Sequence, residues 1–165
     1  MCDLWVLQQK LPSVCAQDIL RRDMDKILGL DYGDSRTGVA ISDALGWTAQ
    51  PLDTIDMKIG AQKVKTQICE LISTHKIKTV VVGFPLNMNG SVGPRAEKTA
   101  EFILSLEVET KGAGVEFVKW DERLTTVIAN RTMHELGIKT KNKRGLVDKI
   151  AAVQILQSYL DTKVK

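Results

Sequence analysis

The run from Thr79 to Phe84 constrains the fold of this chain more than any other feature of its sequence. Its residues, TVVVGF, carry no charge and include three consecutive valines. A half-exposed strand alternates apolar and polar side chains, whereas a strand buried on both faces is apolar almost throughout. The run therefore predicts a central strand that other elements must cover on both sides.

The segments before this run predict an antiparallel meander followed by a helix. We expect strands at 26–32, 37–42 and 47–55, with a tight polar turn, Asp34-Ser35-Arg36, between the first two. An amphipathic helix is predicted over 60–75, because apolar residues recur there at helical spacing: Val64, Ile68, Leu71 and Ile72.

After the run, helices alternate with a further strand. We expect a helix from Pro94 to about 108, a strand at 115–120, a helix at 125–136, a basic loop at 138–145 and a last helix at 146–160. Three antiparallel strands, followed by helices alternating with parallel strands, match the order of the ribonuclease H-like fold. This is an α/β fold in which helices flank a mixed five-stranded sheet.

Length and patterning predict one domain. A chain of 165 residues, 44% of them hydrophobic, is long enough for one core and too short for two ordinary domains. We assign residues 24–165 to a single ribonuclease H-like domain. Residues 1–23 show no clear period and precede a second methionine, Met24, so we expect them to form an N-terminal extension outside the fold.

The cysteines and the apolar runs indicate which classes of protein can be excluded. Cys2, Cys15 and Cys69 lack a CxxC spacing, so they indicate neither a disulfide framework nor a zinc site and favour a reducing compartment. No apolar run approaches the roughly 18 residues that a membrane span requires. We therefore expect a soluble, cytoplasmic protein with no membrane partner.

Asp31 is a candidate site residue because it ends the first predicted strand among apolar neighbours. An ionised carboxylate is rarely buried unless it is paired or coordinates a cation. Gly33 follows closely and has no Cβ, so we expect it to leave room there for a metal or a phosphate. The alternative is that Asp31 only caps the turn that follows.

Two further acids are candidates for the same site. Glu122 follows the fifth predicted strand, and because side chains alternate along a strand, Asp121 is expected to point the other way. Asp148 lies on the apolar face of the last helix, together with Ala152 and Tyr159. The alternatives are an ordinary surface cluster at Glu122 and a first-turn position at Asp148 that suits the helix dipole.

The predicted fold brings Asp31, Glu122 and Asp148 to one edge of the sheet. Hard divalent cations such as Mg²⁺ or Mn²⁺ prefer oxygen ligands, and two such ions can hold both the attacking and the leaving oxygen of a phosphoryl displacement. We therefore predict that these acids form the catalytic and metal-binding site of a two-metal-ion nuclease, in which Asp31 bridges the metals.

Polar and basic residues elsewhere are candidates for contacts with a nucleic-acid backbone. The loop 84–91 enters a helix, so its amides and the helix N-terminus are expected to face phosphates. Lysines and arginines crowd the segment before the last helix. An ordinary loop and a solvated surface are the alternatives. The candidates are Arg36, Asn87, Asn89, Ser91, Arg95, Lys139, Lys141, Lys143 and Arg144.

Four stretches together resemble the motifs of the bacterial YqgF/RuvX family. They are LDYG at 30–33 with RTGVA at 36–40, VGFPLNMNGS at 82–91, DERLTT at 121–126, and VD at 147–148 before AA at 151–152. The resemblance spans about residues 25–161 and implies a ribonuclease H-like fold, with catalytic roles for Asp31, Glu122 and Asp148. Thr37, where an aliphatic residue is common, and Lys149, where a small residue is frequent, are two departures.

Members of this family are described as Holliday junction resolvases and as nucleases that mature the 5′ end of pre-16S rRNA. We therefore expect a hydrolase of phosphodiester bonds that acts on pre-rRNA, in contact with pre-ribosomal particles, as a monomer or homodimer. The alternatives are a resolvase of branched DNA in recombination and repair, and a non-catalytic RNA-binding assembly factor. An actin-like or sugar-kinase-like ATPase shares the Asp-x-Gly turn but requires more than twice this length.

Overall fold

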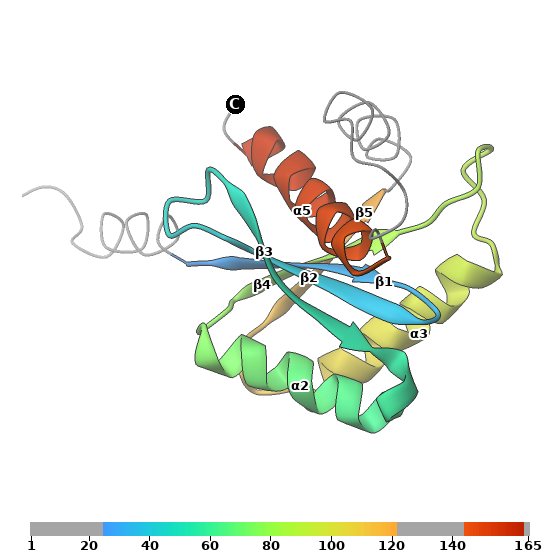
Figure 1. The fold of residues 1–165 in the computed structure, drawn as a ribbon, viewed down its shortest axis with the longest axis horizontal. Helices are drawn as coiled ribbons and strands as arrows, with labels where there is room; N and C mark the ends of the chain where they lie inside the picture. Colours follow the sequence, from blue (N-terminus) through green and yellow to red (C-terminus); the bar gives the residue numbers. More distant parts are fainter. Residues whose placement is uncertain (1–24, 122–143, 164–165) are drawn as a thin grey trace, which may run out of the picture.

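A central β-sheet with helices on both faces organises the residues that the computed structural model describes (Figure 1). These are residues 25–121 and 144–163, with the backbone alone for 144–149. The predicted helix at 125–136 and most of the basic loop at 138–145 lie outside them.

The sheet has five strands in the order β3-β2-β1-β4-β5. The strand β1 (Ile27–Tyr32) lies at its centre and pairs antiparallel with β2 (Arg36–Ser42), which pairs antiparallel with β3 (Ala49–Asp56). On the other side, β4 (Thr79–Phe84) runs parallel to β1, and β5 (Glu116–Asp121) runs parallel to β4. This arrangement confirms the predicted mixed sheet of the ribonuclease H-like fold.

Helices cover the two faces unequally, as Figure 1 shows. The helices α2 (Ala61–Thr74) and α3 (Pro94–Glu109) lie on one face, and α5 (Arg144–Lys163) lies alone on the other among the described helices. A single 3₁₀ turn, η2 (Met57–Ile59), leads from β3 into α2. Within the described residues, no helix has the length and apolar character that crossing a membrane would need.

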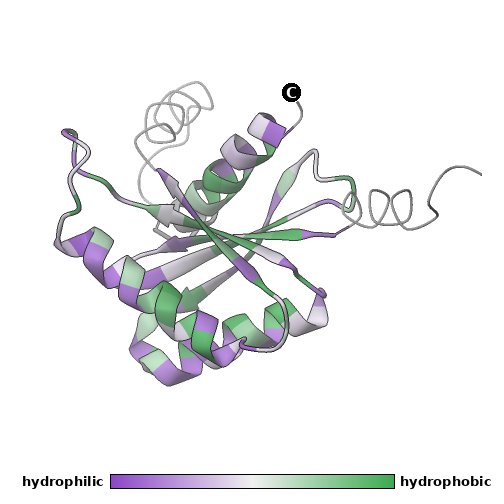
Figure 2. Cartoon of the chain, turned by 180° about the vertical axis from the view of Figure 1, so that it is seen from behind, coloured by the Kyte–Doolittle hydropathy of each residue, from purple (hydrophilic) through white to green (hydrophobic). Residues whose placement is uncertain are grey.

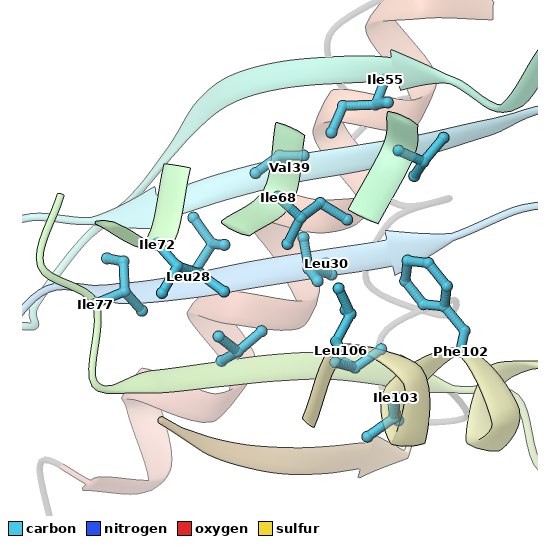
Figure 3. Close-up of a cluster of buried hydrophobic side chains, with 13 residues drawn as sticks. Leu28, Leu30, Val39, Ile55, Ile68, Ile72, Ile77, Phe102, Ile103 and Leu106 are labelled. Carbon is cyan, nitrogen blue, oxygen red and sulfur yellow. The ribbon is translucent and has the colours of Figure 1, made fainter. Parts of the chain in front are cut away.

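The face under α2 and α3 holds the larger of the two cores (Figure 3). Hydropathy is highest along the central strands and on the helix surfaces that face them (Figure 2). Thr37 is fully buried at its margin, and its hydroxyl donates a hydrogen bond to Met57 Sδ at 3.2 Å. The main members of this core are Leu28, Leu30, Val39, Ile68, Ile72, Phe102, Ile103 and Leu106.

The opposite face packs closely on α5 because Gly29 has no side chain. A Cβ at this position would lie 2.7 Å from Leu156 Cβ and 3.2 Å from the Ala152 carbonyl oxygen. Real Cβ atoms do not approach other atoms so closely, so α5 contacts the backbone of β1 directly. The residues of this second core include Ile27, Ala40, Val81, Ala152, Ile155, Leu156, Tyr159 and Leu160.

Candidate active site

Asp31 lies near the carboxyl end of β1, half-buried, on the sheet face that α5 covers. Leu28 and Leu30 point into the core under α2 and α3, whereas Ile27 belongs to the core under α5. Because side chains alternate along a strand, Asp31 shares the face of Ile27 and Gly29. The position combines a carboxylate with a largely apolar sheet.

A glycine lies beside Asp31 on each neighbouring strand. Asp31 pairs directly with Gly38 of β2, and Leu30 pairs with Val82 of β4, so Gly83 is the next neighbour in the parallel register. Both glycines are buried. No side chain therefore stands next to the Asp31 carboxylate on either adjacent strand. We call Gly38 and Gly83 the glycine flank.

Gly33 has a different role from the one that the sequence suggested. Its amide donates a hydrogen bond to the Arg36 carbonyl oxygen at 3.0 Å, and a Cβ on Gly33 would lie 2.7 Å from that oxygen. The absent side chain is thus required by the tight turn between β1 and β2. That Gly33 also leaves room for a metal or a phosphate stays a prediction, and the glycine flank adds two positions without a side chain beside Asp31.

Thr54 continues the same row across the sheet. It pairs with Gly38, and since its neighbour Ile55 points into the core under α2 and α3, Thr54 lies on the face of Asp31. Its hydroxyl oxygen is buried and has no hydrogen-bond partner in the part of the chain that the structure describes. Adjacent strands are about 4.8 Å apart, which places Thr54 roughly 10 Å from Asp31. An unsatisfied buried hydroxyl is the kind of group that an ordered water or a hydrated ion satisfies.

The end of β5 contributes Trp120 to the face of α5. Its indole Nε1–H donates to Ser158 Oγ at 3.2 Å, and its ring meets Tyr159 edge to face at a centroid distance of 5.3 Å. Alternation then places Asp121 on the opposite face, as predicted. Glu122, the next residue, lies outside the described part of the chain.

The C-terminal half of α5 is anchored near the beginning of β1. Gln157 Oε1 accepts a hydrogen bond of 2.8 Å from the Ala49 amide. Ala49 pairs with Ser42, whose hydroxyl oxygen accepts a hydrogen bond of 2.8 Å from the Ile27 amide. Gln157 therefore lies at the amino end of β1.

The N-terminal half of α5 consequently extends toward the other end of β1. Ala152 lies over Gly29, so the helix runs antiparallel to the strand. Asp148 is one turn before Ala152, and its backbone lies further in the direction of Asp31. Among the described side chains, which exclude those of Glu122 and Asp148, no three His, Cys, Asp or Glu lie together.

The loop between β4 and α3 is a small hairpin. Leu86 and Val92 form an antiparallel bridge, the Asn87 amide donates to the Ser91 carbonyl at 3.0 Å, and the Gly90 amide donates to the Asn87 carbonyl at 2.8 Å. The amides of Asn87 and Gly90 are thus used inside the loop and do not face phosphates, whereas phosphate contacts by the helix N-terminus stay a prediction. We call residues 85–93 the finger.

The polar side chains of the finger hold one another. Asn87 Nδ2 donates to Ser91 Oγ at 2.8 Å, and Ser91 Oγ donates to Asn89 Oδ1 at 2.6 Å. The same Asn89 oxygen accepts from the Ser91 amide at 3.0 Å. Three residues that the sequence offered as nucleic-acid contacts therefore brace the shape of the finger.

Two basic residues lie next to the turn that follows Asp31. Arg95, in the first turn of α3, is exposed and lines a small pocket together with Tyr32, Asp34, Lys98 and Thr99. Lys98 Nζ is 3.6 Å from Asp34 Oδ1, with the two side chains 63% and 68% exposed. Such an exposed ion pair is weak, so a phosphate can compete for the lysine.

Lys98 was not among the sequence-based candidates. The available indication was its position three residues after Arg95, on the same side of a helix. Among the other candidates, Arg36 opens β2 and is half-buried, and Arg144 opens α5. The side chain of Arg144 and the whole of Lys139, Lys141 and Lys143 lie outside the description.

Solved structures of low sequence identity share this fold. Thermus thermophilus RuvC in complex with a Holliday junction substrate superposes with a TM-score of 0.55 at 16% identity, covering 85% of this chain and 96% of its own. The yeast mitochondrial Holliday junction resolvase gives a TM-score of 0.56 at 8% identity, covering 90% and 85% respectively. These likenesses establish the fold alone.

Sequence comparison establishes the family. A protein of Acetivibrio thermocellus named "Putative pre-16S rRNA nuclease" is 57% identical over 140 residues, which are 85% of this chain and 98% of its own. A protein of the same name from Clostridium tetani is 47% identical over 139 residues, 83% of this chain and 96% of its own. The family model described as "RuvX: Holliday junction resolvase" matches residues 25–162, and this chain therefore belongs to the RuvX family.

Proposed function

We propose that this protein is a divalent-metal-dependent nuclease that hydrolyses phosphodiester bonds in the 5′-end processing of pre-16S rRNA. The observation that carries the proposal is the setting of Asp31, a half-buried carboxylate at a strand end with a glycine on either side. A carboxylate in such a place suits a bound cation. The name shared by the relatives supports the choice of reaction and of substrate.

Asp31, Glu122 and Asp148 are the residues that would hold Mg²⁺ or Mn²⁺. Carboxylate oxygens suit these hard cations, and the unpartnered Thr54 hydroxyl on the same face suits their ordered water. When bound, the ions would stabilise the charge that develops during phosphoryl displacement. The antiparallel course of α5, which begins at the Asp31 end of β1, supports a place for Asp148 in this set.

The remaining residues of the site would bind and orient the substrate strand. The glycine flank would keep the strands on either side of Asp31 free of side chains where a phosphodiester has to approach. Arg95 and Lys98, next to the turn after Asp31, would bind a neighbouring phosphate, with the basic segment 139–144 supplying further contacts. We assign this activity to residues 24–165, so a chain that lacks residues 1–23 is expected to keep both its melting temperature and its cleavage.

A Holliday junction resolvase is the second candidate, favoured by the description of the family model. The same carboxylates would act in either case, because specificity for a substrate resides in the surrounding surface. Cleavage of a 5′-extended 16S rRNA precursor and of a four-way DNA junction should therefore be measured side by side.

Wild type, Asp31→Asn and Asp161→Asn form the set for this experiment. Asp161 is exposed near the far end of α5, so its variant removes the same charge away from the site. We expect Mg²⁺-dependent cleavage of the rRNA precursor by wild type and Asp161→Asn, and none by Asp31→Asn. Preferential cleavage of the junction would favour the resolvase. Cleavage by Asp31→Asn at the wild-type rate would overturn the assignment of the site.

A further inference from the structure

Met88 is unusually exposed for an apolar residue. It lies at the tip of the finger, and 92% of its surface is accessible, more than for any other large hydrophobic residue in the described part of the chain. Figure 1 shows the connection between β4 and α3 projecting away from the sheet and its helices. The Met88 side chain does not stabilise the fold, because it is almost fully exposed and packs into neither core.

The finger holds Met88 outward. The Leu86 and Val92 bridge closes its base, and Gly90, with a φ of 81°, occupies the left-handed position that ends a three-residue hairpin loop. Ser91 joins both asparagine side chains across the loop. Since the Asn87, Asn89 and Ser91 side chains are paired within the finger, the exposed side chain at its tip is that of Met88.

The location of the finger indicates what it meets. It begins directly after β4, where Gly83 flanks Asp31, and it ends at the start of α3, whose first two turns carry Arg95 and Lys98. No acidic residue occurs between Phe84 and Ala96, and Glu97 is the one acid between Arg95 and Lys98. A neutral projection with basic residues at its base suits a polyanion better than an acidic protein surface.

We propose that Met88 packs against an unstacked base of the bound nucleic acid, so that the finger marks the boundary between paired and unpaired substrate. Apolar side chains, methionine among them, insert beside bases and support local unstacking. The thioether is polarisable and packs favourably on aromatic rings. The inference rests on the proposed nuclease function and adds the substrate feature that the site recognises.

The test compares variants of the full chain on an RNA stem with a single-stranded 5′ extension, carrying 2-aminopurine at the boundary. Binding is measured in chelator, which prevents cleavage. Met88→Gln keeps the length of the side chain and makes it polar, whereas Met88→Leu keeps it apolar. Val108→Gln is the matched control, because Val108 is 73% exposed near the far end of α3.

We expect Met88→Gln to bind this RNA about tenfold more weakly, equivalent to 1.4 kcal/mol, and to lose the fluorescence change at the boundary. Met88→Leu and Val108→Gln should behave like wild type, and all variants should bind a blunt duplex equally. Wild-type binding and fluorescence with Met88→Gln would overturn the inference while leaving the nuclease assignment intact. Failure of wild type to bind or cleave any nucleic acid would overturn both.

Discussion

The two ends of β1 lie under the same helix but differ in how their polar groups are used. At the amino end, the polar groups are paired within the chain by hydrogen bonds of 2.8 to 3.0 Å. The Ile27 amide donates to the Ser42 hydroxyl, which itself donates to the Asp43 carbonyl. The Gln157 side chain accepts from the Ala49 amide and donates to the Trp47 carbonyl. At the carboxyl end, Asp31 lies between two glycines, and the Thr54 hydroxyl, roughly 10 Å away on the same face, has no hydrogen-bond partner among the described residues. Hydrogen bonds within the chain fix the amino end, whereas the carboxyl end holds a half-buried carboxylate and a buried hydroxyl on one face of the sheet.

This difference separates stability from function within one sheet. Hydrogen bonds that satisfy buried groups fix where α5 lies, whereas buried groups left unsatisfied lower stability and are retained where a ligand completes them. Because α5 is anchored by Gln157 and Gly29, its first turns, which contain Asp148, are carried to the Asp31 end. Substitutions at the amino end should therefore change mainly the free energy of unfolding, and substitutions beside Asp31 should change mainly the rate of cleavage.

The largest expected effect comes from adding a methyl group beside Asp31. In Gly38→Ala, the new methyl group would lie about 5 Å from the Asp31 Cβ, because the two residues are directly opposed on antiparallel strands. We expect cleavage to fall about 100-fold, since small displacements of reacting groups have effects of this size. Steady-state cleavage measures this fall, and thermal unfolding shows whether the variant is still folded. Cleavage at the wild-type rate would show that the glycine flank has no part in the site.

The counterpart within the same strand is Gly29→Ala. Its Cβ would collide with Leu156 and with the Ala152 carbonyl, so α5 must move away from β1. Overpacking of this kind is expected to lower the free energy of unfolding by about 1–3 kcal/mol. Urea denaturation measures this loss in the free energy of unfolding. An unchanged midpoint would mean that α5 does not pack as tightly as the structure has it.

A smaller loss of stability is expected at the amino end from Gln157→Ala. The change removes the acceptor for the Ala49 amide, at 2.8 Å, and the donor to the Trp47 carbonyl and to Asp161 Oδ1, at 3.0 and 2.8 Å. We expect a loss of about 1 kcal/mol in the free energy of unfolding, with cleavage by the folded protein unchanged. A loss of cleavage without loss of stability would contradict the division between the two ends.

The smallest expected effect is a gain in stability from Thr54→Val. The substitution keeps the branched shape and removes the buried hydroxyl that has no partner. We expect the metal-free protein to become more stable by up to about 1 kcal/mol. Differential scanning calorimetry in chelator provides the measurement. Destabilisation would show that the hydroxyl is satisfied in solution.

Patterns along the chain were sufficient to predict most of the fold. The valine run became β4, and the periodic segments 60–75 and 146–160 became α2 and α5, with ends that differ by one to three residues. Alternation with Leu28 and Leu30 also predicts the face of Asp31. These features depend on neighbours in the sequence, and local periodicity reports them well.

Features that depend on strand register were not predicted. Gly38 and Gly83 lie 45 residues apart and become neighbours of Asp31 only when three strands pair in one register. The finger was interpreted as an open loop because Asn87 and Ser91 are equally common in hydrogen-bonded turns and in exposed loops. Lys98 resembled any surface lysine until α3 placed it beside Asp34.

The response of the melting temperature to Mg²⁺, in wild type and in Asp31→Asn, tests the central claim most directly. A ligand that binds only the native state raises stability by about 2.7 kcal/mol at a hundred times its Kd. We predict a rise for wild type and for Asp161→Asn, and almost none for Asp31→Asn. In chelator, Asp31→Asn should be at least as stable as wild type, because neutralising one of several close acids relieves repulsion. An equal rise in Asp31→Asn, or no rise in wild type, would contradict the account.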